Sequence, residues 1–342
     1  MKWSKLFRVG LVLLLALSLS ESATAADNFS ELLANSGRLS TLNHITEHGG
    51  QVYASGFLCK PEWNPVPGVN IYTGGFVLAG DVFVYTRSQG TGAFPTELYR
   101  SDVRGGGETV ITGDADSSGG VWAIGGKVLY TSVAETPNYE YVYTGVFCYD
   151  VTTSKKTRLL GALSAEDFFS PVSFDDDFVY YRLRQSGDVR RIRWDGSGDE
   201  VMKGLQLPAD VYTVEGQYYY CVSTDYDEDK TKIHRYTTNG GSWAGVYTID
   251  AAGLIAIQGG SAYFGNTEGI FKMDMDTGTT IRLAALVPKV QGWCFGTGTI
   301  IGNDLYLSAC YDSGEDGANT RLYKVPLDGG KMEYQNVEWF ES

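Results

Sequence analysis

The stretch Gly125-Gly126-Lys127-Val128-Leu129-Tyr130 joins a turn of two glycines to a short apolar strand that ends in tyrosine. Glycine adopts the positive φ angles that a two-residue hairpin turn requires, and apolar runs of this length are typical of strands. The same pattern recurs at intervals of 32, 45, 50, 40, 43 and 43 residues, and about 40–50 residues is the period of one four-stranded propeller blade. The tyrosines of the seven copies are Tyr53, Tyr85, Tyr130, Tyr180, Tyr220, Tyr263 and Tyr306.

A second repeated element lies between these turns, in step with the first. In it, an apolar and basic strand runs into a turn rich in aspartate and glycine, as in Ile192-Arg193-Trp194-Asp195-Gly196. Two hairpin signals per period predict four antiparallel strands in each repeat, and nothing between them has the spacing of a long amphipathic helix. Because one small sheet cannot bury both of its faces, the sheets are expected to pack radially. The sequence therefore predicts an all-β fold, a β-propeller of four-stranded antiparallel blades.

The number of tyrosine-tagged strands favours seven blades, with six blades as the alternative. The first copy is expected to be incomplete, with its third strand at residues 69–72 and no fourth strand before Phe76. The stretch Val337-Glu338-Trp339-Phe340 would supply the missing outer strand and close a ring of seven. In the six-bladed alternative, the first copy is an N-terminal appendage.

The beginning of the chain has the features of an export signal. Basic residues precede an apolar run at residues 10–17, and Ala23-Thr24-Ala25 suits signal peptidase. We expect residues 1–25 to be a signal peptide cleaved near Ala25, residues 26–40 to be a leader, and residues 41–342 to form a single propeller domain. The protein is then secreted or extracytoplasmic. The apolar run is too short to span a bilayer, and no later run is longer, so no integral membrane segment is expected.

Composition narrows the classes of partner. The 342 residues include 43 glycines and 23 tyrosines, which favour strands joined by tight turns. The formal net charge of −14 repels phosphate backbones, which argues against nucleic acid as a partner. The five cysteines show no C-x-x-C spacing, which excludes a zinc knuckle and a thioredoxin motif. Cys294 and Cys310 flank an expected hairpin and could form a cross-strand disulfide.

The copies that run from a basic strand into Asp-Gly carry a family resemblance. Arg191-Ile192-Arg193-Trp194-Asp195-Gly196 and residues 323–330 resemble the low-density-lipoprotein-receptor-related propellers, and most closely secreted bacterial relatives of unassigned function. The chain lacks the Tyr-Trp-Thr-Asp tetrapeptide of the receptor members, so their ligands are not carried over. Those relatives have six blades. The resemblance implies a rigid extracellular module that binds a partner.

The longer connections between second and third strands should share one face of such a propeller. The expected long loops are residues 60–68, 132–144, 222–231 and 309–319, and variable loops on a rigid frame are where binding residues concentrate. Aromatic side chains in them could stack on sugar rings or anchor a protein ligand. The candidate ligand-binding residues are Trp63, Tyr139, Tyr141, Tyr226 and Tyr311.

Two of these loops are acidic enough to suggest a metal site. Calcium takes six or more oxygen ligands in flexible geometry, and carboxylates on a loop can supply several of them. No cofactor is required by the sequence, and Ca²⁺ is the ion that these loops could bind; solvated acidic loops are the alternative. The candidate metal ligands are Asp225, Asp227, Asp229, Asp312 and Asp316.

Motifs of catalysis are scarce. The chain has three histidines, and the H-x-x-E-H match at residues 44–48 ends at Gly49-Gly50, too early for the helix that a zinc peptidase needs. No nucleophile elbow, phosphate loop or dinucleotide fingerprint is present. These observations favour a secreted, non-catalytic binding or scaffold module that presents its long-loop face to an extracellular protein or glycan. The alternative is a carbohydrate-active hydrolase or lyase that uses paired carboxylates near the central channel. The oligomeric state is left open.

Overall fold

The computed structural model of the chain describes residues 40–41, 45–49, 51–54, 57–59, 64–65, 76–87, 96–103, 107–116, 120–137, 141–164, 167–183, 186–206, 211–215, 217–225, 230–237, 242–250, 253–312 and 318–335. These residues form strands, turns and short connections, and no helix occurs among them. The all-β prediction is therefore confirmed for the described ranges. No helix within them is long and apolar enough to cross a membrane.

Successive strands pair antiparallel in groups of four along the chain, and the second and third groups are joined with one further strand into a nine-stranded sheet. The first half comprises β2 (Ile45–His48), β3 (Gln51–Ala54), β4 (Phe57–Cys59), β5 (Asn64–Pro65); β6 (Phe76–Ala79), β7 (Val82–Arg87), β8 (Thr96–Asp102), β9 (Thr109–Ala115); β10 (Val121–Ile124), β11 (Lys127–Glu135), β12 (Tyr141–Asp150), β13 (Lys155–Leu160); and β14 (Phe169–Phe174), β15 (Phe178–Leu183), β16 (Asp188–Arg193), β17 (Glu200–Gln206).

The second half repeats the same pattern in three more groups. They comprise β18 (Val211–Glu215), β19 (Tyr218–Asp225), β20 (Lys230–Thr237), β21 (Trp243–Asp250); β22 (Gly253–Gln258), β23 (Ser261–Asn266), β24 (Gly269–Asp274), β25 (Thr280–Ala284); and β26 (Val290–Ile301), β27 (Asp304–Asp312), β28 (Ala318–Pro326), β29 (Glu333–Tyr334). A further strand, β1 (Ser40–Thr41), pairs with β10, and β9 pairs with β11; these pairings join β1, β6–β9 and β10–β13 into the nine-stranded sheet.

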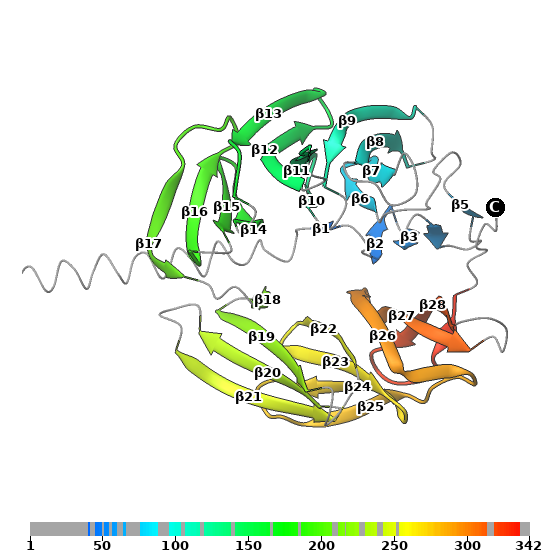
Figure 1. Cartoon of the computed structure of the whole chain (residues 1–342). Helices are drawn as coiled ribbons and strands as arrows, with labels where there is room; N and C mark the ends of the chain where they lie inside the picture. Colours follow the sequence, from blue (N-terminus) through cyan, green and yellow to red (C-terminus); the bar gives the residue numbers. More distant parts are fainter. Residues whose placement is uncertain are drawn as a thin grey trace, which may run out of the picture.

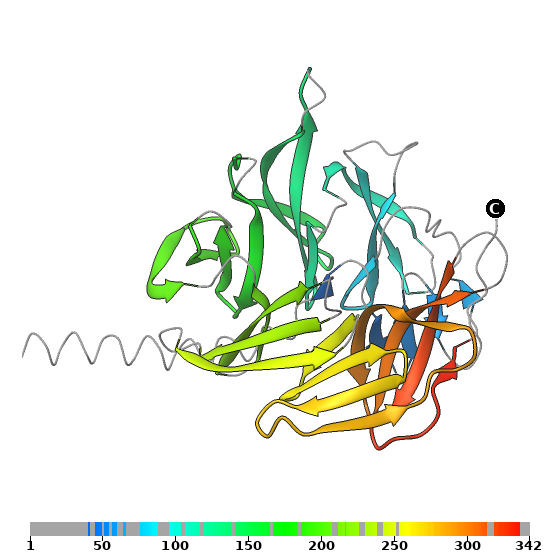
Figure 2. The ribbon, with the colours of Figure 1, turned by 60° about the horizontal axis from the view of Figure 1, so that its bottom comes forward.

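The sheets follow one another around the molecule in chain order, with their first strands nearer the middle and their fourth strands at the periphery (Figure 1). Strand β2 contacts β26, so the first and last sheets lie next to each other. The 60° rotation in Figure 2 brings the lower sheets forward and shows the β11–β12 hairpin projecting well beyond its neighbours. The arrangement is propeller-like.

Each repeated tyrosine lies in the second strand of its sheet, as the sequence predicts. The repeat could be recognised in the sequence because the turns before the second strands require glycine for their own backbone conformation. Gly259 and Gly260, between β22 and β23, have φ angles of 62° and 69°. Both donate their amides to the Glu215 carboxylate of β18, at 2.7 and 3.1 Å. The turn thus also links two neighbouring sheets.

The first sheet differs from the expectation. Strand β4 pairs with β3, and β5 pairs with β4, so the third strand lies at Phe57–Cys59 and a fourth strand precedes Phe76. The sequence-based assignment failed because these strands are only three and two residues long and carry no repeated signal. The expected closing strand at residues 337–340, the signal peptide and most of the leader lie outside the described residues.

Apolar side chains fill the space between adjacent sheets. Leu307 and Tyr323 of one sheet pack with Ile255 and Tyr263 of the preceding one, and each is at most 2% exposed. Similar clusters lie between β10–β13 and β14–β17 and between β18–β21 and β22–β25. Burial of apolar surface stabilises a protein by roughly 25 cal/mol per Å², so these clusters are the main source of stability.

One disulfide and one ion pair link neighbouring segments, and two cysteines are free. Cys148 and Cys221 are free and buried. Cys310 is disulfide-bonded. Ala309, which precedes it in β27, pairs with Phe295, which follows Cys294 in β26. His48 Nε2 lies 2.8 Å from Asp81 Oδ1, which joins β2 to the turn between β6 and β7.

Candidate functional site

The candidate ligand-binding residues are not assembled into one surface within the described ranges. Tyr141 and Tyr311 lie in strands β12 and β27 of different sheets, not in loops. Strands β11, β12, β19, β20, β27 and β28 extend further than predicted, because cross-strand pairing continues into the segments assigned to loops. Tyr141 is 39% exposed. Tyr311 carries the Arg321 guanidinium over its ring, 3.3 Å from the ring centre.

The remaining aromatic candidates, Trp63, Tyr139 and Tyr226, lie outside the described residues, as do Asp227, Asp229 and Asp316. Asp225 and Asp312 are the last residues of β19 and β27, on different sheets, so the two acidic loops do not form a common site through these two residues. Within the described part of the chain, no group of three or more His, Cys, Asp or Glu side chains is placed to hold a metal ion.

A cluster of carboxylates and hydroxyls lies where the outer strand β9 meets the next sheet. Ala115, the last residue of β9, pairs with Ser132 of β11, the one pairing recorded between these two strands. Asp114 and Asp116 flank Ala115. Asp114 reaches Ser132 and Asp116 reaches Thr131, which are consecutive residues of β11 and therefore point to opposite faces of that strand.

Main-chain hydrogen bonds hold the second carboxylate in place. The Asp116 amide donates to the Thr131 carbonyl at 3.0 Å, and the Thr131 amide donates to the Gly120 carbonyl at 2.8 Å. A Cβ at Gly120 would lie 2.0 Å from Thr131 Oγ1 and 3.1 Å from Asp116 Oδ2. Only glycine fits there without displacing these side chains, and Asp116 is 2% exposed.

A β-bulge brings a third strand to the cluster. Ser132 pairs with Gly145 and Val133 pairs with Tyr143, so Thr144 is the extra residue of β12. The bulge re-aims Thr144, whose Oγ1 lies 2.6 Å from Ser132 Oγ. Bulges are common next to active sites because they redirect a side chain out of the regular alternation.

Each carboxylate has its own hydroxyl partners. Asp114 accepts hydrogen bonds from Thr112 and Ser132. Asp116 accepts one from Thr131 Oγ1 at 3.4 Å. Burying a charge is costly unless hydrogen bonds compensate it, and these donors supply that compensation. Asp114 is half-buried and Asp116 is buried, so the two acids differ in their access to solvent.

Two tyrosines report on the charge of the cluster. The pKa of Tyr143 is raised by burial, by the charge of Asp116 and by its hydrogen bond to that carboxylate. The pKa of Tyr130 is raised by burial and next by the charge of Asp114. Both phenols therefore stay protonated at neutral pH, and Tyr143 is a hydrogen-bond donor beside Asp116.

This arrangement can move protons. Two carboxylates with unequal environments, a protonated phenol and several hydroxyls are the groups that general acid–base catalysis uses. Hydroxyls and carboxylates are also suitable partners for the hydroxyl groups of a sugar. The site lies beside the projecting β11–β12 hairpin, on which Tyr141 and Val142 are exposed.

Sequence reasoning missed Asp114 and Asp116. The available signal was the Asp-x-Asp spacing at the end of an expected strand, with Asp114 and Asp116 on either side of Ala115. It was not recognised because acids were sought in loops and near the central channel. The contributions of Ser132 and Thr144 depend on a bulge and a cross-sheet pairing, neither of which has a sequence signature here.

Comparison with known proteins gives matches among solved structures only. No family model matches the chain, and no curated protein matches it. An oligogalacturonate lyase in complex with manganese has 14% identity and a TM-score of 0.43, over 72% of this chain and 74% of that one. An oligogalacturonate lyase from Vibrio parahaemolyticus has 11% identity and a TM-score of 0.44 over the same shares. The acylaminoacyl peptidase of Pyrococcus horikoshii has 11% identity and a TM-score of 0.47, over 89% of this chain and 54% of that one.

The structures in these comparisons are enzymes, and this corrects the interpretation of the chain as a non-catalytic binding or scaffold module. Of the two interpretations of the sequence, the carboxylate-pair alternative is the one that they favour. At such low identity and TM-score, no substrate, residue role or metal is transferred to this chain. The described residues do not fit a manganese ion such as the one named for the first lyase, because they contain no suitable group of ligands.

Proposed function

We propose that this protein is a carbohydrate-cleaving enzyme, a hydrolase or a lyase, in which Asp114 and Asp116 are the paired carboxylates. The observation that carries the proposal is that each carboxylate accepts a hydroxyl of β11, Asp114 from Ser132 and Asp116 from Thr131, beside the bulge at Thr144. The cluster replaces the central channel, where the sequence placed the alternative active site.

The half-buried Asp114 is placed to accept a proton, because solvent and substrate can reach it. In hydrolysis the proton would come from the water that adds to the sugar carbon. In elimination it would come from the carbon next to the sugar's carboxyl group. In either reaction the glycosidic C–O bond breaks and its oxygen takes up a proton from solvent water. Burial, the charge of Asp116 and the hydrogen bond to that carboxylate keep the Tyr143 phenol protonated, so Asp116 orients this side chain.

We also propose the finer features of architecture and location. The described sheets support a seven-bladed propeller, with β2–β5 as the first blade next to the last. The basic and apolar N-terminal stretch supports export and cleavage near Ala25. Kinship with the secreted bacterial relatives of the receptor-related propellers rests on the Asp-Gly turns and stays a proposal.

Activity on a panel of neutral and acidic polysaccharides tests the proposed function. The release of new reducing ends detects both reactions, and absorbance of an unsaturated sugar identifies elimination. Asp114→Asn and Asp116→Asn should each lower kcat about 10²–10⁴-fold, the usual contribution of a general acid or base.

Asp274→Asn is the matched control. Asp274 also accepts a threonine hydroxyl, from Thr277 at 2.9 Å, but it lies at the end of β24, where the next turn begins. Its variant should keep full activity. Thermal unfolding of each variant separates loss of chemistry from loss of fold. The proposal fails if no polymer is cut, or if a folded Asp114→Asn variant retains wild-type turnover on a polymer that is cut.

A further inference from the structure

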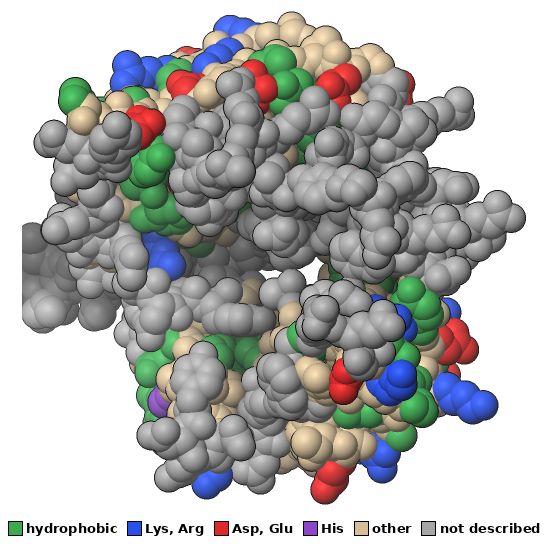
Figure 3. Space-filling view, turned by 45° about the vertical axis from the view of Figure 1, so that its right-hand side comes forward, with side chains coloured by type: hydrophobic (Ala, Val, Ile, Leu, Met, Phe, Trp, Pro, Cys, Tyr) green, Lys and Arg blue, Asp and Glu red, His purple; other side chains and the backbone are tan. Residues whose placement is uncertain are grey.

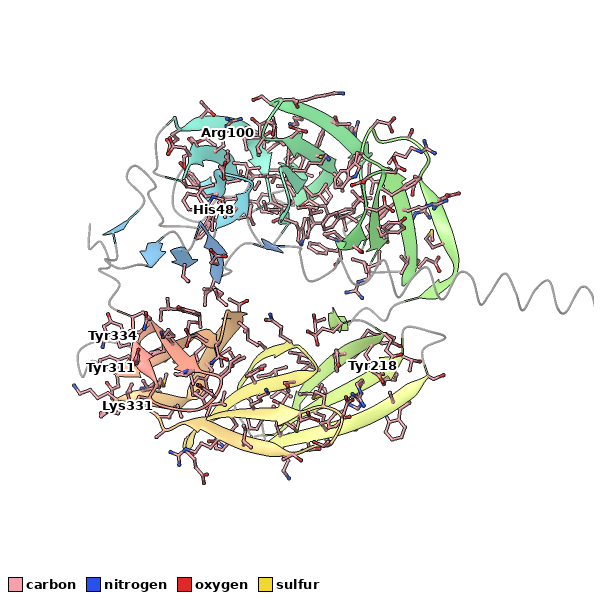
Figure 4. The ribbon with its side chains drawn as sticks, turned by 180° about the vertical axis from the view of Figure 1, so that it is seen from behind. His48, Arg100, Tyr218, Tyr311, Lys331 and Tyr334 are labelled. Carbon is pink, nitrogen blue, oxygen red and sulfur yellow. The ribbon has the colours of Figure 1, made fainter. Side chains whose placement is uncertain are left out.

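A row of three basic side chains lines the outer part of the junction between sheets β6–β9 and β10–β13. Arg100 belongs to β8, where Figure 4 labels it, and Lys156 and Arg158 belong to β13. Lys156 and Arg158 pair with Tyr149 and Phe147 of β12, so both lie on the face of their sheet that packs against β6–β9.

The recorded hydrogen-bond partners of these three cations are all uncharged. Arg100 Nη1 donates to Tyr149 Oη, the Val151 carbonyl and Ser154 Oγ at 2.9–3.1 Å. Lys156 Nζ donates to Thr112 Oγ1 at 3.2 Å, and Arg158 donates to the carbonyls of Thr144 and Leu160. Among the described residues, none of the three forms an ion pair, whereas Arg190, Arg191 and Arg235 each bind a carboxylate.

This pattern is unexpected in a chain with 41 acidic and 27 basic residues. Lys156 and Arg158 are exposed, and acidic side chains lie close to basic ones along the upper edge of the molecule in Figure 3. Acidic groups of the facing elements have recorded partners. Glu108 accepts the Tyr85 hydroxyl, Asp150 accepts the amides of Thr152 and Thr153, and Asp114 accepts the two hydroxyls described above. The cations are therefore available to an external anion.

The row leads directly to the carboxylate cluster. Thr112 receives the Lys156 hydrogen bond and donates to Asp114. Thr144 connects Arg158 to Ser132, the other donor to Asp114. The Phe147 ring lies between them, 4.5 Å from Lys156 Nζ and 6.0 Å from the Arg158 guanidinium carbon. A ligand held by this row would lie beside Asp114.

We propose that Arg100, Lys156 and Arg158 bind the carboxylates of a polyuronate, a glycan with one acidic group on each sugar. This inference rests on the proposed function and specifies its substrate class. Cations whose protein partners are neutral can pair with the carboxylates of such a polymer, and the hydroxyls beside them can hydrogen-bond its uncharged groups. Nucleic acid is disfavoured because its denser charge meets a protein of net charge −14.

Binding and cleavage of polygalacturonate and of its methyl ester test the proposal. The ester keeps the backbone and removes the charge. The variant is Lys156→Gln with Arg158→Gln, and its matched control is Lys155→Gln with Arg282→Gln, which removes the same charge. Lys155 lies on the same strand but on its opposite face, and Arg282 is exposed on β25.

The acidic polymer should bind more tightly than the ester, and the Lys156/Arg158 variant should raise its KM about three- to tenfold with kcat unchanged, as expected for exposed charge pairs. The control pair should leave KM near the wild-type value. Equal affinity for acid and ester, equal weakening by the control pair, or tighter binding of an oligodeoxynucleotide would each overturn the proposal. If polygalacturonate binds through the row but no polymer is cut, the catalytic proposal fails and this one stands. If neutral glycans are cut with no preference for acid, the reverse holds.

Discussion

Two junctions between sheets are built alike but filled differently. Between β22–β25 and β26–β29, the space is occupied by Leu307, Tyr323 and other apolar side chains that are almost fully buried. Between β6–β9 and β10–β13, the inner part is also apolar, but the outer part holds Asp114, Asp116 and a row of cations. The first junction obtains its stability mainly from apolar burial, with a few hydrogen bonds such as that from the Gly330 amide to the Leu283 carbonyl. The second combines apolar packing in its inner part with polar and charged groups in its outer part.

Leu307→Ala should have the largest effect, and it should fall on stability. Leu307 is fully buried in the apolar junction, so its truncation removes packing and leaves a cavity. The free energy of unfolding should fall by about 2–5 kcal/mol in urea titration. Leu307→Met conserves volume and should cost less than about 1.5 kcal/mol. Equal losses for the two variants would show that this junction is not close-packed.

Gly265→Ala should be the next most damaging change. An added Cβ would lie 2.5–2.7 Å from carbons of the Phe295 ring, so the ring must move. Overpacking of this kind costs about 1–3 kcal/mol, measured again by urea unfolding. Gly113→Ala is the control in the other junction, because a Cβ there meets nothing within 4 Å. Adding Phe295→Leu to Gly265→Ala should restore part of the loss, and a failure to restore any would argue against the contact.

Ser132→Ala lies in the polar junction and should lower activity as well as stability, whereas the variants of the apolar junction should lower stability. The variant removes a hydroxyl that donates to Asp114 and contacts Thr144, at a cost in stability of about 1–3 kcal/mol, the value for a bond to a charged group. We expect kcat on the cleaved polymer to fall about tenfold or more, together with a change in the pH profile, because Asp114 is no longer held. Ser132→Thr keeps the hydroxyl and should recover part of the activity. If the pH profile is unchanged, Ser132 has a structural role only.

Calcium should have a smaller effect and act outside both junctions. The candidate loops begin at Asp225 and Asp312, and weak extracellular sites bind with Kd values of roughly 10⁻⁴–10⁻³ M. About 5 mM calcium would then stabilise the fold by about 1–2 kcal/mol, seen as a rise in Tm that EGTA reverses. Asp225→Asn and Asp312→Asn assign the rise to one loop. A Tm that does not respond to calcium would reject both loops.

The smallest expected effect concerns the pH range over which buried tyrosines ionise. Burial raises the pKa of Tyr220 and of Tyr323 to about 12, from 10.0. The folded state then holds protons that the unfolded state releases, so this stabilising contribution is complete below pH 10 and is lost as the pH rises toward 12. Absorbance of tyrosinate and circular dichroism should therefore change together over that interval.

The charge of Asp114 adds to this effect in the polar junction alone. It is the second cause, after burial, of the raised pKa of Tyr130. Asp114→Asn should lower the pKa of Tyr130 by less than about one unit and leave Tyr323 unchanged. The same variation of Asp274 should move neither tyrosine. If Asp114→Asn leaves the Tyr130 titration unmoved, the two groups are not electrostatically coupled.

The parts of the fold that were predictable are those with a local cause. The tyrosine-tagged second strands were found because the preceding turns require glycine and the strands alternate regularly. The first sheet was misassigned because β4 and β5 are too short to show a period. Loop limits were wrong around Tyr141 and Tyr311, because pairing with a neighbour extends a strand beyond its own propensity.

The sequence by itself determined that this protein is made of repeated antiparallel strands, since turn chemistry and alternation act over a few neighbouring residues. It also gave the acidic net charge of the chain. Only the tertiary structure decided that Asp114, Ser132, Thr144 and Lys156 meet, because they come from four strands of two sheets. That meeting depends on a bulge and on the packing of one sheet against the next, and both arise from contacts between residues far apart in the chain.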